Sequence, residues 1–186
     1  MTLQDDVARA FVQEGNLQRI VRELINEDPV DYDLEERSGE GWVDVAVKTT
    51  NRRLLFEIKT HINVLPTGEI HEENVGGTIR QLKKYRKNNP NDVLAAIIPN
   101  QDAGKWAPIY ANAGFWVIAW SGSRLVRCPR CKKERHVDLV GPNSCGADYC
   151  GYKGPFEHVS LKDAVFVLYD RYRPRERKDT LQDSQQ

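Results

Sequence analysis

The sequence predicts an α/β fold with a mixed central sheet. Large apolar residues stand at every second position in two segments, which predicts neighbouring, half-buried strands: Val43, Val45 and Val47 in the first, and Leu54, Phe56 and Ile58 in the second. Residues 93–98 are wholly apolar, which is typical of a central strand that is covered on both faces. Residues 115–120 have the composition of a last core strand, and helical patterns lie before and between these segments. The expected order is helix, three strands, helix, strand, helix, strand.

Local signals support each element in turn. Residues 4–26 carry apolar side chains at helical spacing, and Gly15-Asn16 divides them into two helices. Residues 30–37 are expected to form a first, acidic strand. Residues 61–74 form a long segment rich in turn formers, and loops of that length are often functional. The next helix covers residues 74–88 and ends before Pro90.

The second half adds a small appendage to the core. A short helix over 105–113 is closed by Gly114. A pattern like a capping box at Ser160 predicts a helix over 160–172, and the polar tail 173–186 is expected to be disordered. The predicted units are a core (1–122), a cysteine segment (123–159) that follows the linker 121–123, the C-terminal helix (160–172) and the tail (173–186).

The strands over 43–47 and 54–58 form a hairpin whose turn places two acids face to face. Folding the chain about Thr50-Asn51 puts the aliphatic residues of both strands on one face. Asp44 and Glu57 then lie opposite each other on the other face, with side chains about 5 Å apart. Lys59 points the same way as Glu57. Facing carboxylates repel each other, and a divalent cation is the usual compensation.

This arrangement resembles the PD-(D/E)xK nuclease superfamily. Asp44 matches the first acid of the motif, and Glu57 and Lys59 match its Glu-x-Lys part. Val43 stands where the family usually has proline, a position that varies in the family. Gln81 and Tyr85 have the Gln-x-x-x-Tyr spacing that follows the active site in RecB-like members.

The resemblance implies a restriction-endonuclease-like α/β/α sandwich that hydrolyses phosphodiester bonds. DNA is favoured over RNA as the substrate, and the sequence does not decide between them. The resemblance also implies that Asp44, Glu57 and the backbone carbonyl of Ile58 hold Mg²⁺ or Mn²⁺, and that Lys59 positions or activates the attacking water. Gln81 and Tyr85 are expected to lie near the nucleic acid or to brace the site. Glu23 matches the place of a further family acid, although it can equally face water. Many members dimerise, so a homodimer stays open.

The net charge is zero, but the charges are unevenly distributed. Residues 1–50 hold twelve acids against five bases. Two basic clusters follow, at 80–87 and at 124–136. Such patches attract phosphate backbones, although a single one is more often ordinary solvated surface. The residues expected to bind nucleic acid are Arg80, Lys83, Lys84, Arg127, Arg130, Lys132 and Lys133.

The four cysteines form two close pairs, Cys128 with Cys131 and Cys145 with Cys150, separated by thirteen residues. This spacing predicts a structural zinc site with four thiolate ligands and resembles that of zinc ribbons. An iron–sulfur cluster is the alternative. Disulfides are not expected, because the chain shows no secretion signal. Metal binding would supply folding free energy to a segment too short for an apolar core.

Other functions stay open at this level. The chain has no apolar run of membrane-spanning length, and an intracellular, cytoplasmic location is expected. One alternative is a catalytically inactive nucleic-acid-binding module on a nuclease scaffold. Another is an adaptor that uses the cysteine segment to dock a protein. Endonuclease and exonuclease action are not distinguished.

Overall fold

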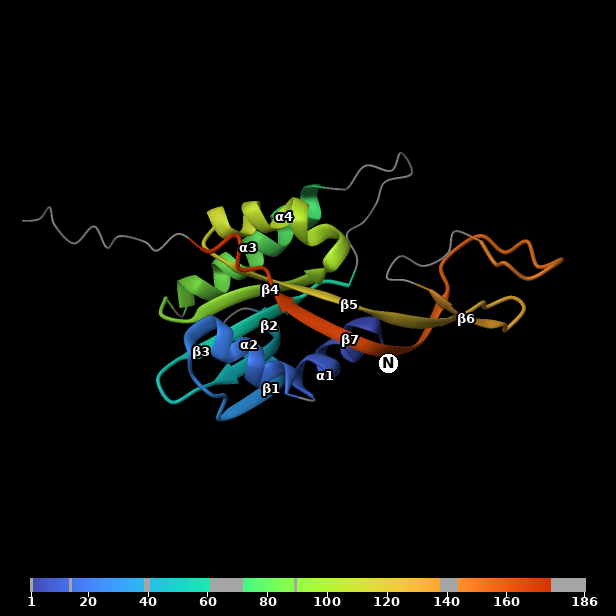
Figure 1. The fold of residues 1–186 in the computed structure, drawn as a ribbon. Coiled ribbons are helices and arrows are strands. Elements are labelled where there is room, and N and C mark those ends of the chain that lie inside the picture. The colour runs from blue at the N-terminus through green and yellow to red at the C-terminus, as the bar shows by residue number, and fades with distance from the viewer. Residues whose placement is uncertain are drawn as a thin grey trace, which may run out of the picture.

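A computed structural model describes residues 2–13, 15–38, 41–60, 72–88, 90–137 and 144–174. The fold is mixed α/β, with four helices and a seven-stranded sheet in these residues (Figure 1). The helices are α1 (Leu3–Val12), α2 (Asn16–Ile25), α3 (Glu72–Asn88) and α4 (Asn100–Asn112). The strands are β1 (Asp31–Ser38), β2 (Gly41–Lys48), β3 (Arg53–Ile58), β4 (Val93–Pro99), β5 (Trp116–Arg127), β6 (Glu134–Val137) and β7 (Glu157–Leu168).

The sheet is antiparallel at both ends and parallel in the middle. Strands β1, β2 and β3 pair antiparallel, and β3, β4 and β5 pair parallel. The first half of β5 pairs with β4, while residues 124–127 pair with β6. Strand β7 runs antiparallel along β5. The predicted order of elements is thus confirmed as far as β5.

Helices cover both faces of this sheet. Helices α1 and α2 pack on one face, where Phe11 makes edge-to-face contacts with Phe56 and Phe166 at ring-centroid distances of 5.0 and 5.1 Å. Helices α3 and α4 pack on the opposite face against residues such as Leu55 and Val117 (Figure 1). The strands of the predicted hairpin are therefore buried on both faces, not half-buried.

The predicted hairpin register is confirmed over its paired residues. Val45 pairs with Phe56 and Val47 with Leu54. At the turn, the N–H of Thr49 donates to the carbonyl of Arg52 at 2.9 Å. The prediction that all the aliphatic residues share one face is wrong.

Leu55 and Val43 pack with α3 and α4, whereas Val45 packs with α1 and α2, although Val43 and Val45 are two positions apart on one strand. The side-chain alternation reverses around Asp44. The ladder between β1 and β2 skips Glu35 and Asp44, which lie between its pairs Leu34–Val45 and Glu36–Val43, and the φ of Glu35, 57°, departs from strand geometry. A distorted backbone at this point re-aims the side chains that follow.

The predicted C-terminal helix over 160–172 is wrong, because residues 157–168 form strand β7. The apolar residues do recur at helical spacing, but β5 offers a long free edge, and backbone pairing along it outweighs the local pattern. The predicted linker 121–123 is also wrong, since these residues lie inside β5. A larger residue would be crowded at position 122, because a Cβ there would come within 3.0 Å of the Leu161 side chain and 3.1 Å of the backbone oxygen of Lys162.

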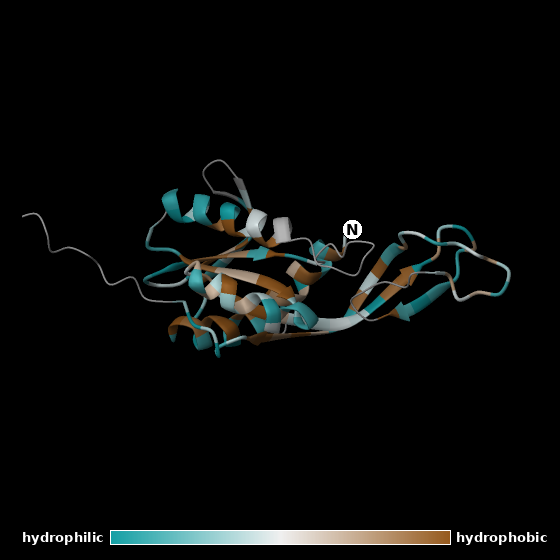
Figure 2. Cartoon of the chain, turned by 90° about the horizontal axis from the view of Figure 1, so that it is seen from above, coloured by the Kyte–Doolittle hydropathy of each residue, from teal (hydrophilic) through white to brown (hydrophobic). Residues whose placement is uncertain are grey.

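The outer parts of β5, β6 and β7 form an arm that projects from the helix-covered core and carries the cysteine segment (Figure 2). Most of the predicted loop 61–74 and nearly all of the predicted tail 173–186 lie outside the described residues. Among the helices that the structure describes, none is both long and apolar enough to cross a membrane.

Candidate functional site

Asp44 lies where β2 and β3 separate. The ladder between the two strands ends at the pair Val45–Phe56, one step before Asp44 and Glu57 would face each other. The Asp44 carboxylate takes the place of the missing backbone partner, because its Oδ2 accepts the N–H of Ile58 at 2.6 Å. The N–H and C=O of one strand residue point to the same side, so the carbonyl of Ile58 also faces this opening.

Glu57 and Lys59 lie at the end of β3 beside it. Lys59 Nζ donates to Glu57 Oε1 at 2.6 Å. The Glu57 side chain is buried, whereas that of Lys59 is about one-third exposed. The Lys59 backbone is held on both sides, because its N–H donates to Ile97 and its carbonyl accepts the indole N–H of Trp120. The ammonium group therefore has a rigid base and a solvent-reachable end.

Tyr85 and Gln81 of α3 meet Glu57 from the other side. The Tyr85 hydroxyl lies 3.3 Å from Glu57 Oε2 and also donates to the carbonyl of Trp42. Gln81 Nε2 donates to the same hydroxyl at 2.6 Å. Tyr85 is only 1% exposed. Of the two roles open from the sequence, this burial favours bracing of the site over contact with a substrate.

The carboxyl groups of Asp44 and Glu57 are electrostatically coupled. Burial, together with the charge of Asp44, raises the pKa of Glu57 to about 7, although Lys59 acts in the opposite direction. Burial likewise raises the pKa of Asp44 against the lowering effects of the Ile58 N–H, Lys59 and Gln4. A buried and a partly buried carboxyl group that repel each other, with one ammonium beside them, are a pattern found at functional sites.

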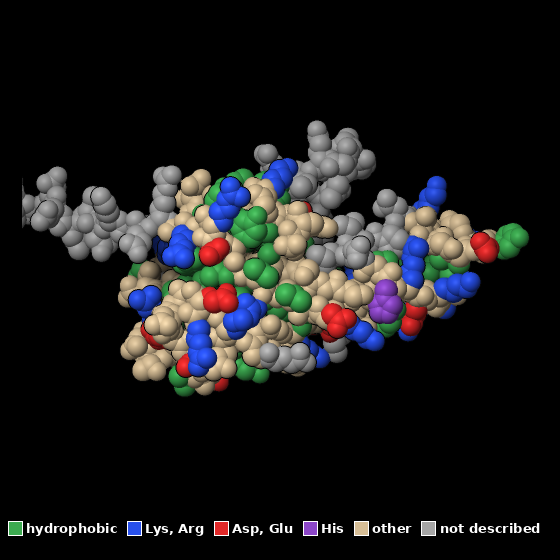
Figure 3. Space-filling view, viewed as in Figure 1, with side chains coloured by type: hydrophobic (Ala, Val, Ile, Leu, Met, Phe, Trp, Pro, Cys, Tyr) green, Lys and Arg blue, Asp and Glu red, His purple; other side chains and the backbone are tan. Residues whose placement is uncertain are grey.

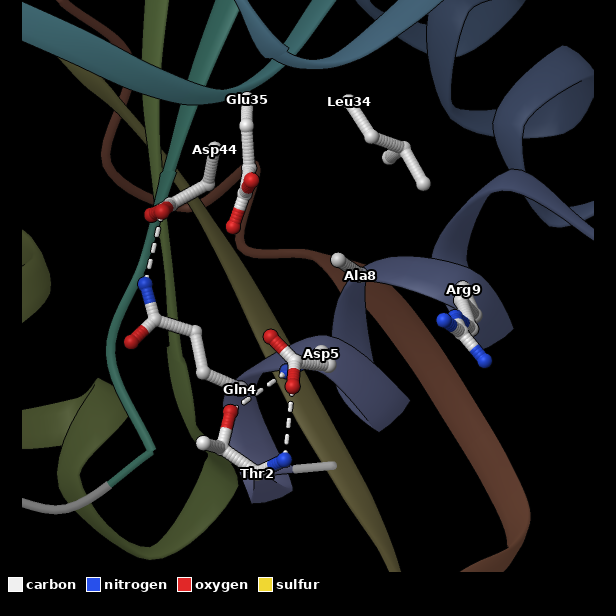
Figure 4. Close-up of a pocket in the computed structure, with 8 residues that line it drawn as sticks. All are labelled: Thr2, Gln4, Asp5, Ala8, Arg9, Leu34, Glu35 and Asp44. Carbon is white, nitrogen blue, oxygen red and sulfur yellow. Dashed lines mark hydrogen bonds between the residues drawn. The ribbon is translucent and has the colours of Figure 1, made fainter.

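Asp44 also borders a hollow of about 580 Å³ between α1 and the strands β1 and β2. Figure 4 shows Gln4 reaching Asp44 from α1 and Glu35 lying beside it. Gln4 Nε2 donates to Asp44 Oδ1 at 2.6 Å. The negative charge of Glu35 contributes to the raised pKa of Asp44. Glu57 and Lys59 are not among the residues that line this hollow.

The structure does not bring Glu23 into this group. Glu23 pairs with Arg19 on the exposed side of α2 at 3.0 Å, and its side chain is 41% exposed. The residues from the helical region and the first strand that do approach Asp44 are Gln4 and Glu35, which the sequence analysis missed. No local pattern marks them, because only the packing of α1 and the distortion of β1 bring them there.

The oxygen donors at this opening are of the chemical kind that hard divalent cations take. Mg²⁺ commonly takes one or two carboxylates, keeps several waters and binds substrate phosphate. Asp44 and Glu57 are the two carboxylates here, and strand geometry directs the Ile58 carbonyl to the side of its N–H, which bonds Asp44. Among the described residues, however, these acids do not belong to a cluster of three or more metal-ligating side chains.

The four cysteines do form such a cluster. Their Sγ atoms all lie within 4.8 Å of one another, and the closest pairs, Cys131–Cys145 and Cys128–Cys150, are 3.6 and 3.7 Å apart. Thiolates about 2.3 Å from one ion lie about 3.8 Å apart at the corners of a tetrahedron. The four cysteines are free thiols rather than disulfides. The cluster could therefore hold one metal ion such as zinc.

Backbone turns preorganise this cluster. The N–H of Cys128 donates to the carbonyl of Lys133, and the N–H of Cys145 donates to that of Tyr152, both at 2.9 Å. Burial raises the pKa of the Cys128 thiol, but backbone N–H groups of Cys131 and Arg130 and the neighbouring thiols together lower it to about 7, whereas burial and the neighbouring thiols raise the pKa of Cys145 to about 11. A thiol that ionises near neutral pH is suited to metal binding.

The predicted basic residues occupy two separate places. Arg80, Lys83 and Lys84 are exposed on α3. The other four lie on the arm, where three are already engaged: Arg127 with Glu134, Lys132 with Glu157, and Arg130 with the carbonyl of Cys150. Lys133 is exposed. On the face of the core shown in Figure 3, basic and acidic side chains are interspersed.

No protein-family model, curated protein or solved structure matches this chain significantly. Its function therefore has to be inferred from the chemistry of the site.

Glu57 should make the stability of the protein depend on pH. A carboxyl group whose pKa is raised from 4.5 to about 7 holds a proton in the folded state that the unfolded chain has released. The free energy of unfolding should therefore fall as pH rises through this interval and level off above it, by an amount on the order of 3 kcal/mol. Asp44 acts in the same direction.

Urea unfolding at about pH 5 and about pH 8, without added Mg²⁺ or Mn²⁺, measures this effect. The Glu57→Gln variant has no carboxyl group at this position and should lose less stability between the two pH values. Parallel losses in the wild type and the variant would contradict the assignment.

Proposed function

We propose that this protein is a divalent-metal-dependent nuclease of the PD-(D/E)xK type that hydrolyses phosphodiester bonds in DNA. The observation that carries the proposal is the approach of Asp44, Glu57 and Lys59 to one another where β2 and β3 separate. These residues are separated in sequence, and they lie just beyond the last pair of the ladder, Val45–Phe56. Helices on both faces of the sheet agree with the sandwich architecture of such nucleases.

Each side chain has a role that its contacts support. Asp44, Glu57 and the carbonyl of Ile58 would hold Mg²⁺ or Mn²⁺, which supplies charge stabilisation and a more acidic bound water. The Lys59 ammonium, next to Glu57, would orient the attacking water or stabilise developing negative charge. Tyr85 and Gln81 would keep Glu57 in place by contact: the Tyr85 phenol is fixed by the Trp42 carbonyl and by Gln81, and its hydroxyl lies 3.3 Å from Glu57 Oε2. Burial and the nearby Glu57 charge raise the pKa of that phenol far above its ordinary value.

The cysteine cluster would carry structural zinc, and the arm would provide a second contact with nucleic acid. The spacing of the Sγ atoms suits a single ion better than an iron–sulfur cluster, because several irons would hold the ligands further apart. The described arm residues, 123–137 and 144–159, contain seven bases (Arg124, Arg127, Arg130, Lys132, Lys133, Arg135 and Lys153) and three acids (Glu134, Asp148 and Glu157). This excess of basic over acidic residues on the arm suits the binding of phosphate groups.

Cleavage assays test the proposal directly. Zinc-loaded protein is incubated with end-labelled single-stranded DNA, double-stranded DNA and RNA, in Mg²⁺, in Mn²⁺ and with neither ion. We expect cleavage of DNA that requires one of the two ions and that is lost in Asp44→Asn. The matched control is Asp33→Asn, because Asp33 is an exposed acid on β1 that pairs only loosely with Lys48, at 3.8 Å. This variant should cleave like the wild type.

Two outcomes would overturn the proposal. Equal cleavage by the wild type and Asp44→Asn would show that the activity comes from elsewhere. Nucleic-acid binding that persists without divalent ions, with no cleavage under any condition, would instead identify a binding module on an inactive scaffold.

A further inference from the structure

The first turn of α1 contacts the candidate catalytic acid directly. A capping box begins this helix, in which Asp5 and Thr2 hydrogen-bond each other's backbone N–H groups. This fixed turn projects Gln4 toward β2, where its Nε2 donates to Asp44 Oδ1 at 2.6 Å (Figure 4). The other carboxylate oxygen of Asp44 is held by the N–H of Ile58. Both oxygens are thus oriented by donors from separate elements.

The same turn is attached to the root of the arm. Asp6 Oδ2 lies 2.9 Å from His158 Nε2 and accepts the N–H of Leu161 at 3.2 Å, and both partners belong to β7. Arg124 of β5 donates to His158 Nδ1 at 3.2 Å. The Nδ1 atom must therefore be the acceptor of the ring, which leaves the proton on Nε2 to be donated to Asp6.

Helix geometry explains how one turn serves both sites. Residues 4 and 6 are two positions apart, which is about 200° around an α-helix, so their side chains point in opposite directions. Gln4 accordingly reaches β2, while Asp6 reaches β7, against which α1 packs. The His158 side chain is 7% exposed and that of Asp6 is 16% exposed, so solvent competes little for this contact.

We infer that Gln4 is a positioning residue for Asp44, and that the Asp6–His158 contact holds the helix turn that presents it. This inference rests on the proposed function, because Asp44 matters as a metal ligand. A donor that holds one oxygen of a ligating carboxylate fixes the direction of the remaining lone pairs. The turn therefore couples the root of the arm to the geometry of the cation site.

The test is the variant Gln4→Met, which keeps the length of the side chain and removes its donor. The titration of the Asp44 carboxyl is followed by ¹³C NMR, with Asp44→Asn to assign the signal. The affinity for Mn²⁺ is measured on the zinc-loaded protein. We expect Asp44 to titrate at higher pH in Gln4→Met, because its ionised form loses a hydrogen bond, and Mn²⁺ affinity to fall about tenfold.

A matched control lies on the neighbouring helix. Gln18 Nε2 donates to Asp28 Oδ1 at 3.2 Å on the exposed surface, so Gln18→Met removes the same kind of bond away from the site. It should leave both readouts unchanged. Asp6→Asn, which weakens the contact with His158, should shift the Asp44 titration in the same direction as Gln4→Met, but less.

The outcomes separate this inference from the proposed function. An Asp44 titration in Gln4→Met that matches the wild type would overturn the positioning role, and a wild-type titration in Asp6→Asn would overturn the role of the β7 contact. The titration does not require cleavage. If no cleavage is found and Mn²⁺ does not bind, the proposed function fails, while the titration still decides whether Gln4 controls Asp44.

Discussion

Lys59→Met is expected to lower the rate of DNA cleavage about 10²–10³-fold without weakening Mn²⁺ binding. The ammonium group has no lone pair to give to a metal and at present donates to Glu57 Oε1 at 2.6 Å. It therefore competes with a cation for that oxygen, and its removal frees the oxygen. Because Lys59 also lowers the pKa of Glu57, both measurements are made well above pH 7, where this carboxyl group is ionised. What the variant would lose is the positive charge that the proposed mechanism places beside the attacked phosphate. Single-turnover cleavage and Mn²⁺ titration, measured on the same preparations, separate these two effects.

Lys48→Met is the control for this experiment. Lys48 belongs to the same hairpin and lies opposite Arg53 in the strand ladder, at the end away from Asp44. Its side chain is 54% exposed. The Lys48→Met substitution changes the net charge of the protein by the same amount as Lys59→Met, and the rate of cleavage should stay within about twofold of the wild type. If Lys59→Met cleaves as fast as Lys48→Met, the ammonium has no role in the reaction.

Loss of one cysteine ligand should abolish metal binding and unfold the far end of the arm. Of the described residues between 128 and 156, only Cys128 and Cys150 are buried, so this segment has almost no apolar core of its own. Structural zinc supplies an apparent binding free energy of about 10–16 kcal/mol in such segments. Cys128→Ser should therefore bind no stoichiometric zinc and lose hydrogen-exchange protection in β6 and the cysteine turns. The helix-covered core should keep its protection, because its contacts do not involve this segment.

Metal content and amide exchange of the purified protein measure this result. Ser144→Ala is a suitable control, because Ser144 is exposed and its backbone carbonyl, not its side chain, accepts the bond from Arg135. We expect one zinc per chain in the wild type and in the control. Iron and sulfide in place of zinc would favour the iron–sulfur alternative, and unchanged zinc content in Cys128→Ser would exclude the predicted ligand set.

Local signals predicted the parts of the protein in which the deciding residues are close in sequence. The turn at Thr50-Asn51 sets the hairpin register by counting, so the pairing of Val45 with Phe56 follows directly. The cysteine spacing predicted a cluster for a similar reason, because each pair comes from one short turn. The strand over 157–168 was missed, because its partner β5 is a long-range neighbour that no local pattern reveals.

The candidate site shows the same division. The sequence by itself determined that Asp44, Glu57 and Lys59 stand at neighbouring places on two paired strands. Only the tertiary structure decided their surroundings: the end of the ladder at Val45, the burial of Glu57 beneath Tyr85, and the approach of Gln4 rather than Glu23. The physical reason is that the pairing of two strands joined by a tight turn depends on short-range geometry, whereas burial, helix placement and the pairing of distant strands depend on which distant surfaces pack together.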